Sequence, residues 1–253
     1  MENTFGTISR MKNRFVIFST GRDCSPFVGL HFESILSQNY NRFRAITVVD
    51  GDQSLTSEIT KRYVAPIANE TVIGSLASLA QHLTVNDDEI LVFLDLDDWF
   101  FRPDTLALLN EVYSDPSVWI TYGNYICSTG EPGHCTLWAG DTSPRTCPWI
   151  FSHLKTMRGF VWNRINKEDF KGPDGEYARA CADRAIMYPA LEMAGPEHTF
   201  FIDTPLVVYN RHVNNNIDKA DTNYAHEMRV WFESRPSYSR LVVGDKRLAF
   251  HGA

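Results

Sequence analysis

The sequence predicts an α/β protein whose central sheet is mainly parallel and flanked by helices. Three observations support this fold class. An apolar run, an amphipathic segment and a second apolar run follow one another within the first 50 residues, as in a β-α-β unit. The most apolar run of the chain, residues 90–94 (ILVFL), has the length of a buried strand. Aspartate-rich turns follow the second run and residues 90–94, and open α/β sheets bind ligands at such strand ends.

The β-α-β unit begins with residues 15–19 (FVIFS), which form a short apolar run typical of a buried strand. Residues 26–38 are expected to form a helix, and Pro26 suits its first turn, where a missing N–H costs nothing. Residues 43–49 (FRAITVV) then predict a second strand, which ends in Asp50-Gly51-Asp52. Two strands joined by a helix are expected to pair in parallel through a right-handed crossover.

The remaining elements are predicted from the same periodicities. Residues 127–148 are rich in Gly, Pro, Thr and Cys, and no regular structure is predicted there. The chain contains no internal repeat or linker, so a single domain over residues 1–253 is expected. Helices are expected at residues 54–62, 73–83, 103–112, 176–193 (kinked near Pro189) and 221–232, and strands at residues 118–122, 200–202 and 206–209.

The composition excludes some classes of partner. A net charge of -7 argues against nucleic acid, whose phosphates need a basic surface, but it permits a small phosphate ligand beside a metal ion. The five cysteines form no C-x-x-C pair, so free thiols in a reducing, cytoplasmic compartment are expected. Residues 1–14 lack the apolar segment of a signal peptide, and residues 90–94 are too short to span a bilayer. We expect a soluble protein, with peripheral membrane contact left open.

The turn Asp95-Leu96-Asp97-Asp98 is the central chemical feature. Three carboxylates so close together repel one another unless a positive charge lies among them. Mn²⁺ or Mg²⁺ suits oxygen ligands and commonly bridges phosphates. The pattern therefore predicts a metal ion with a diphosphate, and the alternative is an acidic turn that merely ends a strand.

A second interpretation of the same turn is the nucleophile motif of phosphatases of the haloacid dehalogenase type, in which Asp95 would attack phosphate. Two features count against it. Trp99 stands where those enzymes usually carry Thr or Val, and about two β-α units precede the motif, which in those enzymes opens the domain.

Asp50-Gly51-Asp52 is the second acidic turn. A carboxylate at the end of this strand can accept hydrogen bonds from a base or a ribose. A tight turn with solvated aspartates explains the same residues equally well.

Four segments together resemble family 2 glycosyltransferases, which have the GT-A fold. They are residues 15–20, 33–40 (ESILSQNY), 46–51 (ITVVDG) and 90–98, and they cover the first half of the chain. Parts of the second half, residues 152–195 and 208–210, resemble a subset of this family found in bacteria and large DNA viruses. The resemblance implies a nucleotide-sugar-binding half at residues 1–125, and an acceptor half with a C-terminal helix at residues 126–253.

The resemblance also implies roles for particular residues. Asp95 and Asp97 would bind the metal, with His212 as a third candidate ligand, although a solvent-exposed loop histidine is the alternative. The helix at 73–83 carries neither the Arg nor the Asn that many members have, which leaves its donor contacts open. The donor-binding residues implied are Thr20, Arg22, Asp50, Asp52, Asp95, Leu96 and Asp97.

Asp183 corresponds to the general base of the family, which deprotonates the acceptor hydroxyl. Ala182 replaces the Glu that usually precedes it, and a salt bridge or a surface carboxylate is the alternative role for Asp183. Glu176 and Glu192 are weaker candidates for the base. Trp99 is a candidate to line the site, with core packing as the simpler explanation.

The function implied is that of a metal-dependent, inverting hexosyltransferase using Mn²⁺ or Mg²⁺. It would move a sugar from a nucleoside-diphosphate sugar, most simply a UDP-sugar, to a hydroxyl of a glycan or glycoconjugate. The phosphatase and a non-catalytic nucleotide-sugar-binding module are the alternatives, and the missing Glu before Asp183 is the feature that leaves the latter open.

Overall fold

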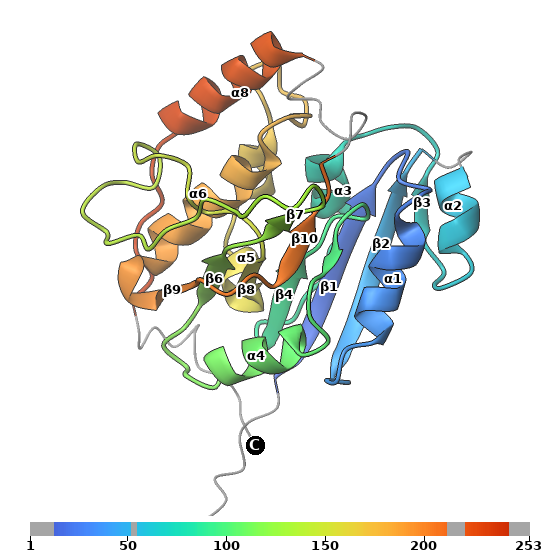
Figure 1. Ribbon diagram of the computed structural model, residues 1–253. Coiled ribbons are helices and arrows are strands. Elements are labelled where there is room, and N and C mark those ends of the chain that lie inside the picture. Colours follow the sequence, from blue (N-terminus) through green and yellow to red (C-terminus); the bar gives the residue numbers. More distant parts are fainter. Residues whose placement is uncertain (1–12, 52–54, 212–220, 243–253) are drawn as a thin grey trace, which may run out of the picture.

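A seven-stranded sheet forms the centre of the molecule, in the order β3-β2-β1-β4-β8-β6-β9 (Figure 1). The computed structural model describes residues 13–51, 55–211 and 221–242. The strands of this sheet are β1 (Arg14–Gly21), β2 (Phe43–Asp50), β3 (Ile67–Asn69), β4 (Glu89–Phe93), β6 (Ile120–Gly123), β8 (Lys155–Arg158) and β9 (Thr199–Ile202).

The central sheet is mainly parallel, which confirms the predicted fold class. β3, β2, β1 and β4 all run in parallel, and β6 and β9 form a second parallel pair. Only β8 among these strands is antiparallel to both of its neighbours, β4 and β6. The sequence of β8 (KTMR) has neither an apolar run nor an apolar alternation, so periodicity did not predict it.

A second, three-stranded sheet joins three short segments that are distant in sequence. It consists of β5 (Trp99–Phe100), β10 (Val207–Tyr209) and β7 (Ile126–Cys127), with β10 in the middle. β10 pairs antiparallel with β5 and parallel with β7. A carboxylate oxygen of Asp98 accepts the backbone N–H of Asn210 at 2.8 Å, so this sheet brings Tyr209 close to the acidic turn after β4.

The helices lie beside both ends of the central sheet (Figure 1). α1 and α2 lie near β2 and β3, whereas α6 lies near β6 and β9 and α8 lies farther out, beyond α6. The chain between β7 and β8 has no helix or strand, as predicted for residues 127–148. The helices are α1 (Val28–Leu36), α2 (Leu55–Thr60), α3 (Ser75–His82), α4 (Thr105–Val112), α5 (Gly159–Trp162), α6 (Ala182–Ala194) and α8 (Thr222–Ser234), with 3-10 turns at Lys167–Phe170 and Pro196–His198.

Most predicted helices are found within a few residues of their expected limits, but the start of α6 was predicted wrongly. The helix begins at Ala182 rather than at residue 176. Gly172 and Glu176 close a turn by a backbone hydrogen bond of 2.8 Å, and Cys181 adopts a left-handed conformation with φ of 59°. A non-glycine residue in this conformation interrupts helical hydrogen bonding, so the helix starts only after Cys181.

Helices cover both faces of the sheet, and the side chains of β1 and β4 show which helix covers which face. Phe18 of β1 pairs with Phe93 of β4, so both side chains point to one face, where Phe93 contacts the α5 residue Trp162. Ser19 points to the other face and lies 3.0 Å from Nε2 of His31 in α1. α1 and α5 therefore cover opposite faces of the sheet.

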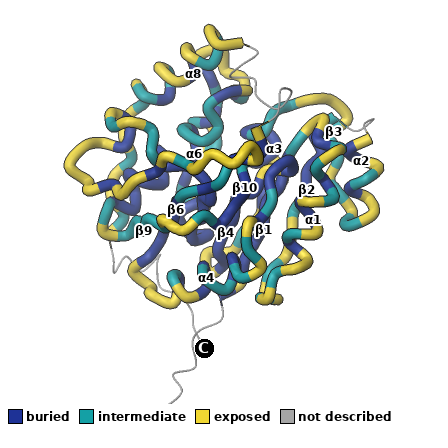
Figure 2. The backbone as a smooth tube through the Cα atoms, viewed as in Figure 1, coloured by how far each residue is buried: buried dark blue, intermediate teal, exposed yellow. Residues whose placement is uncertain are grey.

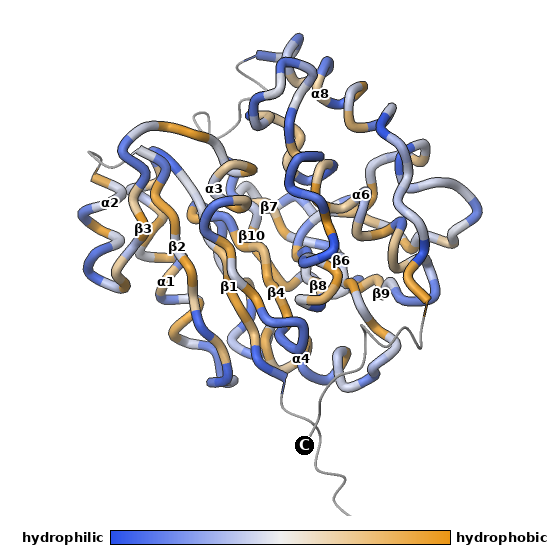
Figure 3. Tube along the Cα trace, turned by 180° about the vertical axis from the view of Figure 1, so that it is seen from behind, coloured by the Kyte–Doolittle hydropathy of each residue, from blue (hydrophilic) through white to orange (hydrophobic). Residues whose placement is uncertain are grey.

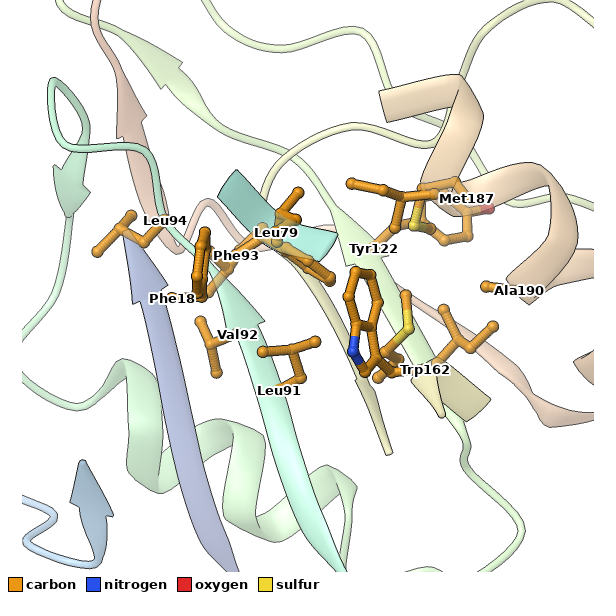
Figure 4. Packing of buried hydrophobic residues seen from close by; sticks show 14 of the residues in the cluster. Phe18, Leu79, Leu91, Val92, Phe93, Leu94, Tyr122, Trp162, Met187 and Ala190 are labelled. Atoms are coloured by element: carbon orange, nitrogen blue, oxygen red, sulfur yellow. The ribbon is translucent and has the colours of Figure 1, made fainter. Parts of the chain in front are cut away.

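The interior is built from the two central strands and the helices around them. β1 and β4 are buried along almost their whole length, whereas α8 and the long loops are largely exposed (Figure 2). Seen from behind, the strands form the most hydrophobic band of the molecule (Figure 3). A close view shows Phe18 and Leu79 near the strands and Trp162 near Met187 of α6 (Figure 4). None of the described helices is both long enough and apolar enough to cross a membrane.

Candidate active site

Three parallel strands end at the same edge of the sheet. β1 ends at Gly21, β2 ends at Asp50, and Asp95 follows β4 after one residue. The turn after β4 continues along β1, since the N–H of Leu94 bonds to the carbonyl of Phe18 and that of Leu96 to the carbonyl of Thr20, both at 3.1 Å. The two acidic turns therefore converge, as expected at the carboxyl ends of parallel strands.

A pocket of about 660 Å³ opens at this edge of the sheet. Its volume lies in the range of small-molecule and cofactor sites. It is bordered on one side by the ends of β1, β2 and β4 and on the other by the segment that leads into α6. The predicted site residues that line this pocket are Thr20, Arg22, Asp50, Asp95, Asp97 and Asp183.

One predicted site residue, Leu96, does not line the pocket, and two others cannot be placed relative to it. The side chain of Leu96 is fully buried and belongs to the core. A methyl group at Gly21 would lie 2.8 Å from Cβ of Leu96, so this turn packs against β1 without room for a side chain. Asp52 and His212 lie outside the described residues.

Asp50 supports the wall of the pocket. Its two carboxylate oxygens accept the backbone N–H groups of Ile73 and Gly74, each at 2.9 Å, and the side-chain amide of Asn69 donates at 3.1 Å. These bonds tie the end of β2 to the segment that begins α3. Asp50 is thus a structural anchor for the pocket, and its Oδ2, which accepts only the Gly74 N–H among these bonds, retains a lone pair for a ligand.

The acidic turn after β4 concentrates negative charge. Surrounding protein displaces bulk water around Asp95, and this effect together with the charge of Asp97 raises the pKa of Asp95 to about 7. Burial and the charges of Asp97 and Asp95 also raise the pKa of Asp98 well above its usual range. Asp98 is buried and has a carboxylate oxygen with no hydrogen-bond partner. The site therefore favours the approach of a positive charge.

Asp183 lies in the first turn of α6 and forms a salt bridge with Lys155 of β8, with 2.8 Å between Oδ1 and Nζ. The surrounding protein displaces bulk water, which by itself would raise the pKa of Asp183, but the Lys155 ammonium outweighs this effect and holds that pKa below its usual value. The carboxylate is therefore ionised at neutral pH. Its side chain is 42% exposed and lines the pocket.

Several pocket residues were not predicted from the sequence. Trp149, rather than Trp99, contributes an aromatic ring to the pocket, and the guanidinium of Arg184 stacks on it at 4.8 Å. His153 stacks on Tyr209 with 4.9 Å between ring centres. Its pKa is lowered to about 3, mainly by burial and to a smaller extent by the charge of Lys155. No local pattern marks these residues, because their place in the pocket depends on how distant segments pack together.

Comparisons with known proteins give a fold but no family. No family model matches the chain, and no curated protein matches it either. Solved structures do match. The S. aureus TarS 1-349 structure with UDP-GlcNAc has a TM-score of 0.63 and 13% identity, covering 82% of this chain and 61% of that one.

Two further solved structures match over similar lengths. Mannosyl-3-phosphoglycerate synthase from Rubrobacter xylanophilus has a TM-score of 0.58 and 14% identity, covering 86% of this chain and 72% of that one. The Pyrobaculum calidifontis mannosyltransferase PcManGT, in complex with GDP-Man and Mn²⁺, has a TM-score of 0.52 and 15% identity. This match covers 77% of this chain and 55% of that one. The chain spans between 37% and 61% of the length of the matched TarS structures. These structures have the GT-A glycosyltransferase fold, and this chain has that fold as well.

Proposed function

We propose that this protein is a metal-dependent, inverting glycosyltransferase that moves a hexose from a nucleoside-diphosphate sugar to an acceptor hydroxyl. One observation carries the proposal. Asp50, Asp95, Asp97 and Asp183 come from three separate segments of the chain and line one pocket at the carboxyl ends of β1, β2 and β4. The GT-A fold and the donors bound in the matched structures support a UDP-sugar or a related nucleotide sugar as the donor.

The donor set of the pocket fits a hard divalent cation such as Mn²⁺ or Mg²⁺. Asp95 and Asp97 would supply carboxylate oxygens, and a cation would offset both causes that raise the pKa of Asp95, the displacement of bulk water and the charge of Asp97. Within the described ranges no group of three or more His, Cys, Asp or Glu side chains is placed to hold a metal. The diphosphate and water would serve as further ligands, as is common for Mg²⁺, and His212 is a candidate from the sequence.

The chemistry assigns a separate task to each part of the pocket. Asp183 takes the proton of the acceptor hydroxyl as that oxygen attacks the anomeric carbon from the face opposite the leaving diphosphate, which inverts the configuration. A cation on Asp95 and Asp97 would stabilise the negative charge of the leaving diphosphate. Thr20, Arg22 and Asp50 would hold the nucleotide, with Asp52 as a further candidate from the sequence, whereas the buried side chain of Leu96 is not available for this role.

The acceptor is proposed to be a glycan or glycoconjugate that enters beside Trp149 and Asp183. Flat aromatic faces such as that of Trp149 suit sugar rings, and its position in the pocket supports this placement. A cytoplasmic location, with peripheral membrane contact where the acceptor is a lipid-linked glycan, completes the proposal. The five cysteines, all without disulfides, support a reducing compartment.

Thermal unfolding with a panel of nucleoside diphosphates, each with and without Mn²⁺, tests this function. A ligand that binds only the folded state raises the midpoint of unfolding. We expect a metal-dependent shift for one nucleotide, which Asp97→Ala abolishes and which Asp141→Asn, a change at an exposed residue outside the pocket, leaves intact.

Two other outcomes separate the alternatives. No shift with any nucleotide, together with phosphate release from small phosphoesters that Asp95→Asn abolishes, would establish the phosphatase instead. Nucleotide binding without sugar transfer, unaffected by Asp183→Ala, would establish a non-catalytic binding module.

A further inference from the structure

Arg179 belongs to the second half of the chain and lies beside pocket residues that come from the first half. It lies in the turn before α6 and lines the pocket together with Gly74 and Ser75, which begin α3. Its Cγ atom is 3.7 Å from the point where a Cβ on Gly74 would lie. The Gly74 N–H donates to the carboxylate of Asp50. Arg179 therefore lies next to the part of the pocket where the nucleotide is proposed to bind.

The position of Arg179 is set by α8. The hydroxyl of Tyr224 accepts the backbone N–H of Arg179 at 3.1 Å, and the guanidinium carbon lies 5.3 Å from the centre of the Tyr224 ring. Tyr224 itself lies in the first turn of α8, where its N–H bonds to the capping side chain of Asp221 at 3.0 Å. The arginine is thus held at the rim of the pocket by a cation–π contact and a backbone bond.

The guanidinium of Arg179 differs from the other cations that line the pocket. Arg22 lies 3.5 Å from Asp23, and Arg184 lies 3.2 Å from Glu233. Arg179 forms no ion pair with any carboxylate in the part of the chain that the structure describes, although four aspartates line the same pocket. Its N–H donors are therefore open to an anionic ligand that lies between it and those aspartates.

A diphosphate in this pocket needs such a cation. The sequence of α3 (SLASLAQH) brings no charged residue to the pocket, and Gly74 and Ser75 contribute no positive side chain. The planar fork of a guanidinium donates two parallel hydrogen bonds to phosphate oxygens. We propose that Arg179, held by Tyr224, binds the diphosphate of the donor. This inference rests on the proposed function, because it presupposes a nucleoside-diphosphate ligand.

Calorimetric titration with UDP and with uridine, both in the presence of Mn²⁺, tests the assignment. In Arg179→Gln the affinity for UDP is expected to fall roughly 10- to 100-fold, because charge-assisted hydrogen bonds are lost, whereas the affinity for uridine stays unchanged. Arg229→Gln, at an exposed position of α8 outside the pocket, serves as the matched control and should bind both ligands like the wild type.

A second variant separates a binding role from a structural one. Tyr224→Leu keeps Arg179 but removes its support, so UDP affinity should fall in the same direction and by less. Unchanged UDP affinity in Arg179→Gln would overturn the inference, and an equal loss for UDP and uridine would overturn the diphosphate contact. Failure of the wild type to bind UDP or any other nucleoside diphosphate would instead remove the proposed function itself.

Discussion

The ammonium of Lys155 lies 2.8 Å from Oδ1 of Asp183 and links the antiparallel strand β8 to the first turn of α6. The two partners differ in their surroundings, since the side chain of Lys155 is 4% exposed and that of Asp183 is 42% exposed. The buried lysine therefore depends on the aspartate for compensation of its charge, whereas the aspartate also faces water in the pocket. The salt bridge and the proposed base role of Asp183 are compatible, because the lysine keeps the carboxylate ionised.

Asp183→Asn is predicted to destabilise the protein more than Lys155→Met. The asparagine leaves a buried ammonium without its partner, which costs about 3 kcal/mol, at the lower end of the usual range because the charge of Asp95 also stabilises Lys155. Methionine fills the space of the lysine stem and leaves Asp183 facing water, so its cost should be about 1 kcal/mol or less. Urea unfolding of both variants at neutral pH measures the difference, and the reverse order would contradict the asymmetry.

Asp50→Asn is predicted to loosen the segment that begins α3. In asparagine an NH₂ group replaces one of the two carboxylate oxygens. One of the two backbone N–H groups that donate to Asp50 in the wild type would then face another donor. We expect a loss of about 1–3 kcal/mol in the free energy of unfolding and faster hydrogen exchange at Ile73 or Gly74. Asn69→Ala is the matched control, since it removes one side-chain contact to Asp50 and leaves both backbone bonds. Slow exchange at both amides in Asp50→Asn would contradict the prediction.

Glu89, at the start of β4, gives a prediction for acid stability. Burial raises its pKa, but hydrogen bonds from Arg44 at 3.1 Å and from the Asn86 N–H at 2.8 Å outweigh burial and hold that pKa below its ordinary value of 4.5. A carboxyl group with a lowered pKa in the folded state stabilises the protein above its unfolded pKa. This stabilisation is lost as the pH falls from 4.5 through the folded pKa.

Glu89→Gln should therefore make the free energy of unfolding depend less on pH in the acidic range. The free energy of unfolding of the wild type, measured in urea between about pH 5 and about pH 3, should fall more steeply than that of the variant. Parallel curves over this range would show that Glu89 does not change its pKa on folding. Glu89 lies at the opposite end of β4 from the acidic turn, so nucleotide binding at neutral pH is expected to persist in this variant.

Glu192 is predicted to be a structural residue rather than a catalytic one. It forms a buried ion pair with Arg145, with 2.9 Å between Nη2 and Oε2, and it accepts the N–H of Tyr238 at 3.0 Å. Arg145 also donates to the carbonyl of Phe232, so the pair joins α6 to α8 and to the segment that follows it. Glu192→Gln should cost about 3–5 kcal/mol, because the arginine stays buried without a full counter-charge.

Thermal unfolding and limited proteolysis of Glu192→Gln check this role. The midpoint should fall, and cleavage should appear first in residues 221–242, whose contacts to α6 are weakened. Glu197→Gln is the matched control, because that ion pair with Arg240 is exposed and contributes little. A midpoint equal to that of the wild type would show that the pair is replaceable.

Local patterns in the sequence predicted the three longest strands of the first half of the fold, but not the short strands β3 and β5. The apolar runs at 15–19, 43–49 and 90–94 correspond to β1, β2 and β4. Strands that are buried in a parallel sheet have short, nearly continuous apolar sequences, which are visible in the sequence itself. The acidic residues after β2 and β4 were both assigned to donor binding by the family resemblance, and the carboxyl ends of parallel strands lie at one edge of a sheet. Asp50 and Asp95 do line one pocket, whereas the roles assigned to them remain predictions.

Tertiary contacts alone decided the second half of the site. β8 carries two basic residues in four, so nothing in its sequence shows that Lys155 is buried against Asp183. The packing of Arg179 over Gly74 joins positions more than 100 residues apart in the chain, and the choice of Trp149 over Trp99 depends on how a loop without regular structure folds back. The physical reason is common to all three. Periodicity reports which side of an element meets the core, whereas the partners that meet across the pocket are selected by the packing of distant segments.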